Sequence, residues 1–304
     1  MEVRKSEKEK MKVRRNEKEK MEVRRNEKEK MEVRRNEKEK MEKSISYTQY
    51  NIKNTDSNYY LYELYRSIEN CKNGNLLYRL SHKALTYQIH DLYLWRLIEQ
   101  KFYELHKELT PKEISSIINY FKQIKINDSK IYENSIDIIL SSIHTYSLHD
   151  LSVICLSYTY FNNKVNTVFI NKIADAIIKL YEQEKSTIHK LTKKELYRLL
   201  ISYVHIIGAY SKIRHKNIEL FKIASIYIYG ALTTDITIPA KIIIKIINSY
   251  SNVKIKHSKI FDLIAKDIPT MKITDEELKV IKRNFDELKY SNETLDKYIQ
   301  YRLS

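Results

Sequence analysis

The chain is poor in the residues that bend a backbone or cross-link it. Its 304 residues include only three glycines, three prolines, two cysteines and one tryptophan. A P-loop and a dinucleotide-binding fingerprint each need several glycines within a few residues, so that the backbone can approach phosphate. Gly74, Gly208 and Gly230 stand too far apart for either motif. Both of these nucleotide-binding classes are therefore excluded.

Residues that carry chemistry are also sparse. Cys71 and Cys155 have no CxxC spacing and are typical of reduced, buried thiols of an intracellular protein. The nine histidines are scattered, without the i, i+4 spacing of a helical metal site, and we find no nucleophile–base arrangement. We therefore expect no enzymatic activity, no cofactor and no metal. No apolar run approaches about 18 residues, so we expect no membrane insertion.

Residues 1–40 are four copies of a decapeptide close to MEVRRNEKEK. They carry 17 Lys/Arg and 11 Glu, whereas residues 41–304 carry 38 basic and 28 acidic residues, so both parts are basic. A ten-residue repeat advances a helix by about 1000°, so its Met and Val form no apolar stripe. We expect residues 1–44 to be disordered or a solvated single helix. Two interpretations fit this tract. It is either a repeat expansion without function or a basic arm that binds nucleic acid.

Aromatic side chains mark a period of about 37 residues in the rest of the chain. Trp95, Tyr132 and Phe169 are spaced by 37 residues. A second series, spaced by 37, 45, 47 and 35 residues, consists of Phe121, Tyr158, Tyr203, Tyr250 and Phe285. A period of 20–50 residues with two helices in each predicts an α-solenoid, whose long surfaces usually bind a ligand and seldom catalyse a reaction.

Each aromatic of the second series follows a helix start of one type. The segments with a Ser or Thr three residues before an acid are Thr110/Glu113, Ser147/Asp150, Thr192/Glu195 and Thr274/Glu277. The hydroxyl accepts a hydrogen bond from the helix N-terminus, and a Glu reaches back to close a capping box. The copy before Tyr250 has Pro239 instead, which fits the first helical turn.

These patterns predict an all-α protein, an α-solenoid of about six antiparallel helix pairs with a charged low-complexity N-terminal extension. We divide it into the charged repeats at 1–44, a partial first unit at 45–74 and an α-helical repeat domain at 75–304. Strand alternation is not found.

The capped helices are the candidate ligand-binding surface. Counted from the capping hydroxyl, offset 10 is polar in every copy: Tyr120, Ser157, Ser202, Ser249 and Asn284. Polar residues in register could bind successive units of a linear ligand such as RNA; close packing between neighbouring helices is the alternative interpretation. Basic residues on or beside these helices could contact phosphates. The candidate RNA-binding residues are therefore Ser116, Tyr120, Lys122, Ser157, Arg198, Ser202, Lys245, Ser249, Arg283 and Asn284.

Runs such as DLYLWRLIEQKF and LTPKEISSIINYFKQIKINDSKIYENSIDIIL resemble heptatricopeptide repeats, the helical repeats of organellar proteins that are similar to those preceding RAP domains. The resemblance covers about residues 75–304. It implies an α-solenoid that binds organellar RNA, often ribosomal RNA or mitochondrial transcripts, without catalysis.

We therefore expect an RNA-binding protein of mitochondrial RNA stability, processing or ribosome assembly, with ribosomal or other repeat proteins as further partners. The N-terminal tract is rich in Glu, unlike a mitochondrial presequence, so the mitochondrial location follows from the resemblance alone and a cytoplasmic one is the alternative. The alternative function is a protein–protein interaction scaffold that does not bind RNA, its basic charge reflecting an AT-rich coding sequence.

Overall fold

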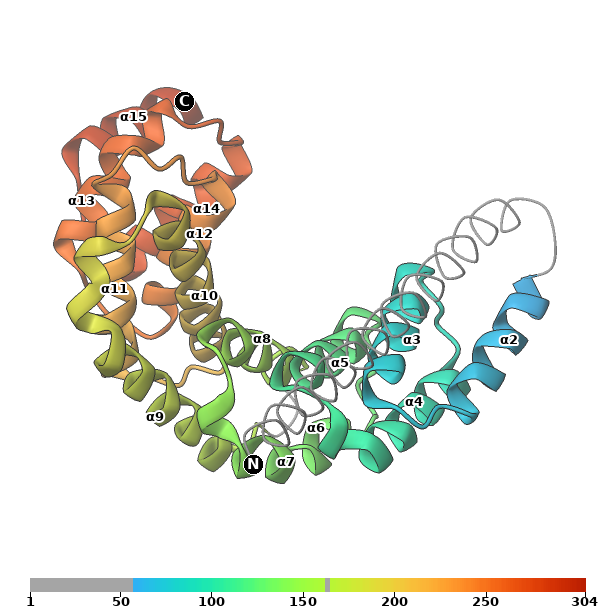
Figure 1. Ribbon diagram of the computed structural model, residues 1–304. Helices are drawn as coiled ribbons and strands as arrows, with labels where there is room; N and C mark the ends of the chain where they lie inside the picture. Colours follow the sequence, from blue (N-terminus) through green and yellow to red (C-terminus); the bar gives the residue numbers. More distant parts are fainter. Residues whose placement is uncertain (1–56, 162–164) are drawn as a thin grey trace, which may run out of the picture. The chain divides into compact units, whose positions relative to one another are not determined.

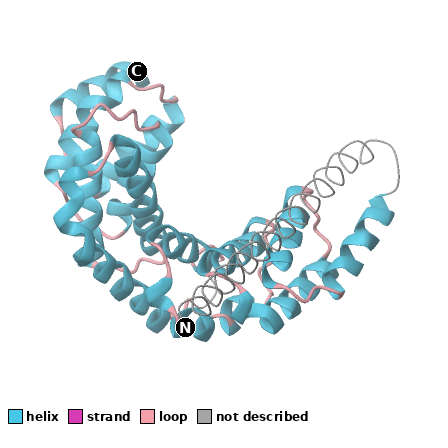
Figure 2. Ribbon diagram, in the orientation of Figure 1, coloured by secondary structure: helices cyan, strands magenta, loops and turns pink. Residues whose placement is uncertain are grey.

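The described residues form an all-α protein (Figure 2). The structure, a computed structural model, describes residues 57–161 and 165–304, and in these ranges it contains helices and turns but no strand. The predictions for residues 1–44 and for the start of the partial unit at 45–74 lie outside the described residues. The chain divides into two units, 1–63 and 64–304, and the description below concerns the second.

The helices of the described residues are joined by short turns. They are α2 (Ser57–Glu69), α3 (Gly74–Thr86), α4 (Leu92–Leu105), α5 (Pro111–Gln123), α6 (Ile131–Asn134), α7 (Ile136–Ser141), α8 (Leu148–Tyr158), α9 (Thr167–Glu184), α10 (Lys193–Lys212), α11 (Ile218–Leu232), α12 (Ala240–Asn252), α13 (Ser258–Asp267), α14 (Asp275–Glu287) and α15 (Glu293–Leu303). Short 3-10 turns join some of them, at His106–Glu108, Ile143–Thr145, Lys185–Lys190 and Ile268–Thr270.

The helices pack side by side in two rows, and the members of each row are roughly every second helix of the chain (Figure 1). In the first row, each of α3, α5, α8, α10, α12 and α14 packs against the next. In the second row, α7, α9, α11, α13 and α15 do the same. The chain alternates between the rows, because α3 packs on α4, α8 on α9, α10 on α11 and α14 on α15.

The four predicted capping boxes are confirmed. At the start of α5, the Glu113 amide donates to Thr110 Oγ1 at 3.3 Å, and the Thr110 amide donates to the Glu113 carboxylate at 2.8 Å. Asp150 also closes its box, since the Ser147 amide donates to it at 3.2 Å. Pro239 lies one residue before α12 and gives it no side-chain cap.

The two aromatic series meet between the rows. Trp95 of α4 contacts Phe121 of α5 with ring centroids 5.0 Å apart, and Tyr158 lies 4.6 Å from Phe169 by the same measure. Phe261 and Phe285 repeat this contact at 5.7 Å. In these three pairs, aromatic side chains therefore join helices that are consecutive in the chain through the core.

One predicted helix is divided. A single amphipathic helix is expected around Tyr132, but α6 ends at Asn134 and α7 begins at Ile136. The hydroxyl of the buried Ser135 donates to the carbonyl of Ile131, four residues earlier, and also lies 2.7 Å from the hydroxyl of Tyr158. Serine bonded to its own backbone competes with regular helical hydrogen bonds, which explains the break.

Five first-row helices end in the same way, without glycine. The second residue after the last helical one has a positive φ in each case: Gln88, Lys125, Arg214, Lys254 and Lys289. After α5, the Ile126 amide donates to the carbonyl of Phe121 and the Lys125 amide to that of Lys122, a Schellman motif. Four of these five ends therefore place a cation at the negative end of a helix dipole.

Candidate nucleic-acid interface

A group of basic side chains from four consecutive first-row helices forms the candidate site. We call Lys122, His149, His205, Lys212 and Lys245 the basic cluster. They come from α5, α8, α10, α10 and α12. Burial, and after it the nearby Lys245, Lys122 and His149, lower the pKa of His205 to about 4. His205 is therefore a neutral imidazole among positive charges near pH 7.

The pKa values of all three lysines of the basic cluster are lowered. Burial and then Lys212 lower the pKa of Lys122, and burial and then Lys122 lower that of Lys245. Among the described residues none of the three lysines forms an ion pair, although Lys193 does so with Asp235 at 3.0 Å. Lys122 and Lys245 are half-buried, whereas Lys212 is exposed and donates to a backbone carbonyl. A half-buried positive charge without an opposite charge beside it is unfavourable, and a bound anion would relieve it.

A glycine positions Lys245. A β-carbon added to Gly208 of α10 would lie 2.7 Å from Cε of Lys245 and 3.7 Å from Oγ of Ser249. No side chain could occupy this position without moving Lys245. Gly208 therefore lets the stem of Lys245 cross the surface of α10 and brings its ammonium close to the other cations.

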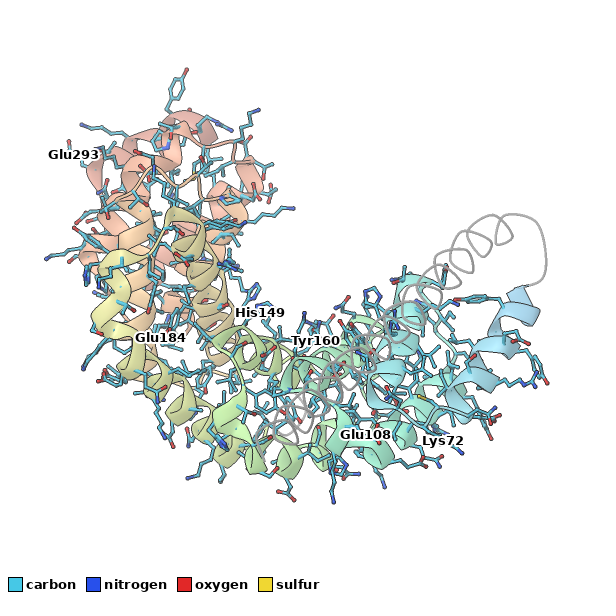
Figure 3. All side chains as sticks on the ribbon, in the orientation of Figure 1. Lys72, Glu108, His149, Tyr160, Glu184 and Glu293 are labelled. Atoms are coloured by element: carbon cyan, nitrogen blue, oxygen red, sulfur yellow. The ribbon has the colours of Figure 1, made fainter. Side chains whose placement is uncertain are left out.

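An aromatic side chain holds Lys212 at the other end of the basic cluster. The Lys212 ammonium lies 4.8 Å from the ring centroid of Tyr160 and also donates to the carbonyl of that residue. Tyr160 lies two residues after the end of α8, whereas His149 lies in the first turn of the same helix (Figure 3). The ring contact adds a cation–π attraction to the hydrogen bond.

The five predicted residues at offset 10 lie between neighbouring helices. Tyr120, Ser157, Ser202, Ser249 and Asn284 are all buried. The hydroxyl of Ser157 donates to the carbonyl of Val153 at 2.8 Å, and that of Ser249 to the carbonyl of Lys245 at 2.6 Å. These positions favour the close-packing interpretation, and direct RNA contact by these five residues stays a prediction.

Two of these buried residues orient asparagines of the preceding first-row helix. Asn284 donates from Nδ2 to Oδ1 of Asn248 at 2.5 Å, and Ser157 donates to Oδ1 of Asn119 at 3.5 Å. Asn119 and Asn248 occupy offset 9 and are half-buried. Their amide groups remain as donors once the oxygens have accepted these bonds.

The structure separates the predicted cations into two groups. Lys122 and Lys245 belong to the basic cluster. Arg198 is exposed near Glu195, whose pKa is lowered mainly by hydrogen bonds from Thr192 and further by Arg198. Arg283 is also exposed, and with Lys254 and Ser251 it lowers the pKa of Glu287. Ser116, the remaining predicted residue, is half-buried.

Sequence reasoning missed Lys212, His205, His149 and Tyr160. Lys212 escapes the repeat alignment because α10 has 20 residues whereas α5 has 13, so Lys212 has no counterpart in the shorter copies. The available signal was Gly208, a glycine inside a helical pattern three residues after His205, since such a glycine often marks a close approach.

Neither a metal site nor a membrane helix appears in ranges 57–161 and 165–304. No group of three or more His, Cys, Asp or Glu side chains could hold a metal ion there, and no helix there is long and apolar enough to cross a membrane. The two cysteines are free and buried. The chain matches no known family and no curated protein.

Proposed function

We propose that this protein is an α-solenoid of about six antiparallel helix pairs, of the heptatricopeptide-repeat kind, that binds RNA. Support for the solenoid comes from the chain's alternation between two rows of helices and from the capping boxes that recur at the first-row starts. Such folds are defined by repeats that each pack mainly on their neighbours.

The observation that carries RNA binding is the uncompensated charge of the basic cluster. Lys122 of α5 and Lys245 of α12 lie near neutral His205, and Lys212 of α10 lies near Lys122. Each of the three lysines has a pKa lowered first by burial. A phosphate backbone supplies the regularly spaced negative charge that such a surface lacks. Tyr160 beside Lys212 offers an exposed ring on which a base could stack.

The biological setting belongs to the same proposal. The resemblance to heptatricopeptide repeats favours the mitochondrion, with ribosomal RNA or organellar transcripts as ligands. The processes would be RNA stability, RNA processing or ribosome assembly. Ultraviolet crosslinking of the tagged protein in its own cells, followed by sequencing of the recovered RNA, would identify the ligand. Recovery of stoichiometric protein partners without RNA would instead support the interaction scaffold.

A charge-reversal pair tests the basic cluster directly. Binding of the full chain to a fluorescent single-stranded RNA is measured by anisotropy at several salt concentrations. We expect the Kd to rise with salt, because phosphate contacts release counterions. We expect Lys122→Glu/Lys245→Glu to weaken binding by at least roughly tenfold and to flatten the salt dependence.

The matched control carries the same change of charge elsewhere. Lys172 and Lys179 are exposed on α9 of the second row. The variant Lys172→Glu/Lys179→Glu should keep most of the affinity. Equal losses in the two variants would show that net charge alone attracts RNA, and binding independent of salt would contradict the proposal.

A further inference from the structure

A cavity of about 340 Å³ lies between the C-terminal halves of α10 and α12. Its wall includes three cations, Lys212, Arg214 and Lys245, and the two amides of Asn248 and Asn252. None of the described residues that line it carries a carboxylate. The cavity is thus an open surface hollow rich in hydrogen-bond donors.

Several of these donors are not used by neighbouring side chains. Among the described residues neither Lys245 nor Arg214 forms an ion pair. The side-chain oxygen of Asn248 accepts a hydrogen bond from Asn284, so the amide group of Asn248 is left as a donor. Lys212 keeps two further N–H bonds beside its contact with Tyr160.

The backbone at the cavity is arranged around these cations. Gly208 makes room for Lys245, as described above. Arg214 has φ of 53°, in the left-handed region that usually favours glycine, and it follows the last turn of α10. Four other first-row helices end in the same turn, so this φ belongs to the helix end. Arg214 differs from the residues at those other ends because its side chain lines the donor-rich hollow.

We propose that this cavity binds one phosphoryl group of the phosphomonoester class. A phosphodiester carries one negative charge and two terminal oxygens, whereas a phosphomonoester carries almost two charges and three terminal oxygens. A phosphomonoester therefore fits a site with three cations, one of them a guanidinium, better than a phosphodiester does. The group can come from a phosphorylated RNA end or from a free nucleotide; only the first source rests on the proposed RNA binding.

The test compares RNA oligonucleotides of one sequence that differ only at their ends. Affinity of the full chain is measured for the 5′-phosphorylated, 3′-phosphorylated and unphosphorylated forms, and separately for AMP and inorganic phosphate by calorimetry. We expect one phosphorylated end to bind about tenfold more tightly than the hydroxyl form, as a charge-assisted contact allows.

The diagnostic variant is Arg214→Gln. Glutamine is compatible with this backbone, because Gln88 has φ of 51° at the equivalent end of α3. Lys125→Gln is the matched control, since Lys125 has the same left-handed backbone after α5 and does not line the cavity. Arg214→Gln should abolish the preference for the phosphorylated end, whereas Lys125→Gln should retain it. Asn252→Asp, which places a carboxylate in the cavity, is the second variant should Arg214→Gln fail to fold.

The outcomes separate this inference from the proposed function. Equal affinity for all three RNAs, with no binding of AMP or phosphate, overturns the cavity site and leaves RNA binding intact. Binding of AMP or phosphate that Arg214→Gln removes, without any RNA binding, supports the cavity site and contradicts the proposed function. Absence of binding by every probe overturns both.

Discussion

At the scale of single residues, packing forces cations together. Lys122, Lys245 and His205 lie on three different helices of the first row. Lys122 and Lys245 both lower the pKa of His205, and Lys122 also lowers that of Lys245. The fold holds them because the apolar residues of these helices are buried at the same interfaces, such as Ile117 and Ile246. The clustered positive charge therefore lowers the free energy of unfolding, and this loss can be measured in the free protein.

His205 makes the fold sensitive to mild acid. Its pKa is about 4 in the folded chain, lowered from 6.5 first by burial. The unfolded chain therefore takes up the proton first, and the stability present above pH 6.5 is lost as the pH falls toward 4. Between pH 7 and 5 we expect a loss of about 1 kcal/mol from this group, after allowance for solvent screening. Urea unfolding at several pH values measures it.

The comparison with His205→Gln decides whether this residue is responsible. The substitution should reduce the slope of stability against pH in that range. His257, whose pKa burial also lowers, should contribute in the same direction and keep some slope. The carboxylates with lowered pKa values, such as Glu113, lose their contribution only at lower pH. An unchanged slope in the variant would be inconsistent with the structure.

Replacing Gly208 with alanine should change stability and binding in opposite directions. Alanine favours a helix over glycine by about 1 kcal/mol, and the atom it would meet is the flexible end of Lys245. We therefore expect unfolding at a slightly higher urea concentration together with weaker RNA binding, because Lys245 moves away. Gly230, whose added β-carbon would lie 3.8 Å from Leu196, is the control, and alanine there should leave RNA binding unchanged.

The sequence predicted only part of this site, for a physical reason. Lys122 and Lys245 were predicted from charge on the capped helices, and both belong to the basic cluster. The polar offset-10 residues gave the more regular pattern, yet they are buried. A period identifies positions that are equivalent in every repeat, whereas the basic cluster combines different offsets of α5, α8, α10 and α12. Such a combination depends on how far each helix extends.

At the scale of the elements, local rules explain most helix boundaries. A capping box begins α5, α8, α10 and α14, and asparagine or aspartate caps α3, α4, α9, α11 and α15. Helix starts could therefore be predicted from side chains. The first-row ends could not, because the left-handed residue is Lys, Arg or Gln where glycine is the usual signal.

Removing one cap measures its contribution. Ser147→Ala should lower the free energy of unfolding by about 1 kcal/mol, since the Asp150 amide loses its acceptor at 3.2 Å. Asp150 lies between two helices and also accepts from Ser115 at 3.2 Å, so Asp150→Ala should cost more. Chemical denaturation of the two variants tests this order, and Thr274→Ala, at an exposed cap, gives the comparison. A larger loss in Ser147→Ala than in Asp150→Ala would contradict it.

The left-handed helix ends offer stabilising substitutions. Lys125 has φ of 64°, a conformation that costs an L-residue energy and glycine little. Lys125→Gly should therefore raise the free energy of unfolding by about 0.5 kcal/mol, despite the loss of a cation near the helix C-terminus. Lys130, which precedes α6 with a negative φ, is the control, and glycine there should not stabilise. Destabilisation by Lys125→Gly would show that its side chain makes the larger contribution.

At the scale of the whole molecule, the main contacts of each helix in residues 64–304 are with its neighbours. Stability in such a fold is close to a sum of local interfaces, and the terminal elements open most easily. α10 packs against α8, α11 and α12, whereas α15 packs mainly against α13 and α14. Hydrogen exchange of the full chain should therefore be slowest in α10 and fastest toward α15. Uniform protection across these helices would indicate global cooperativity instead.

The single tryptophan gives the molecule a built-in optical probe of one place. Trp95 is buried, its indole donates to the carbonyl of Ile89 at 2.7 Å, and its ring packs on Phe121. Its emission therefore reports the contact between α4 and α5, whereas circular dichroism averages over every helix. In a chain of neighbour contacts the two signals need not change together. If tryptophan emission and circular dichroism change at different denaturant concentrations, their order would show from which end the protein begins to unfold.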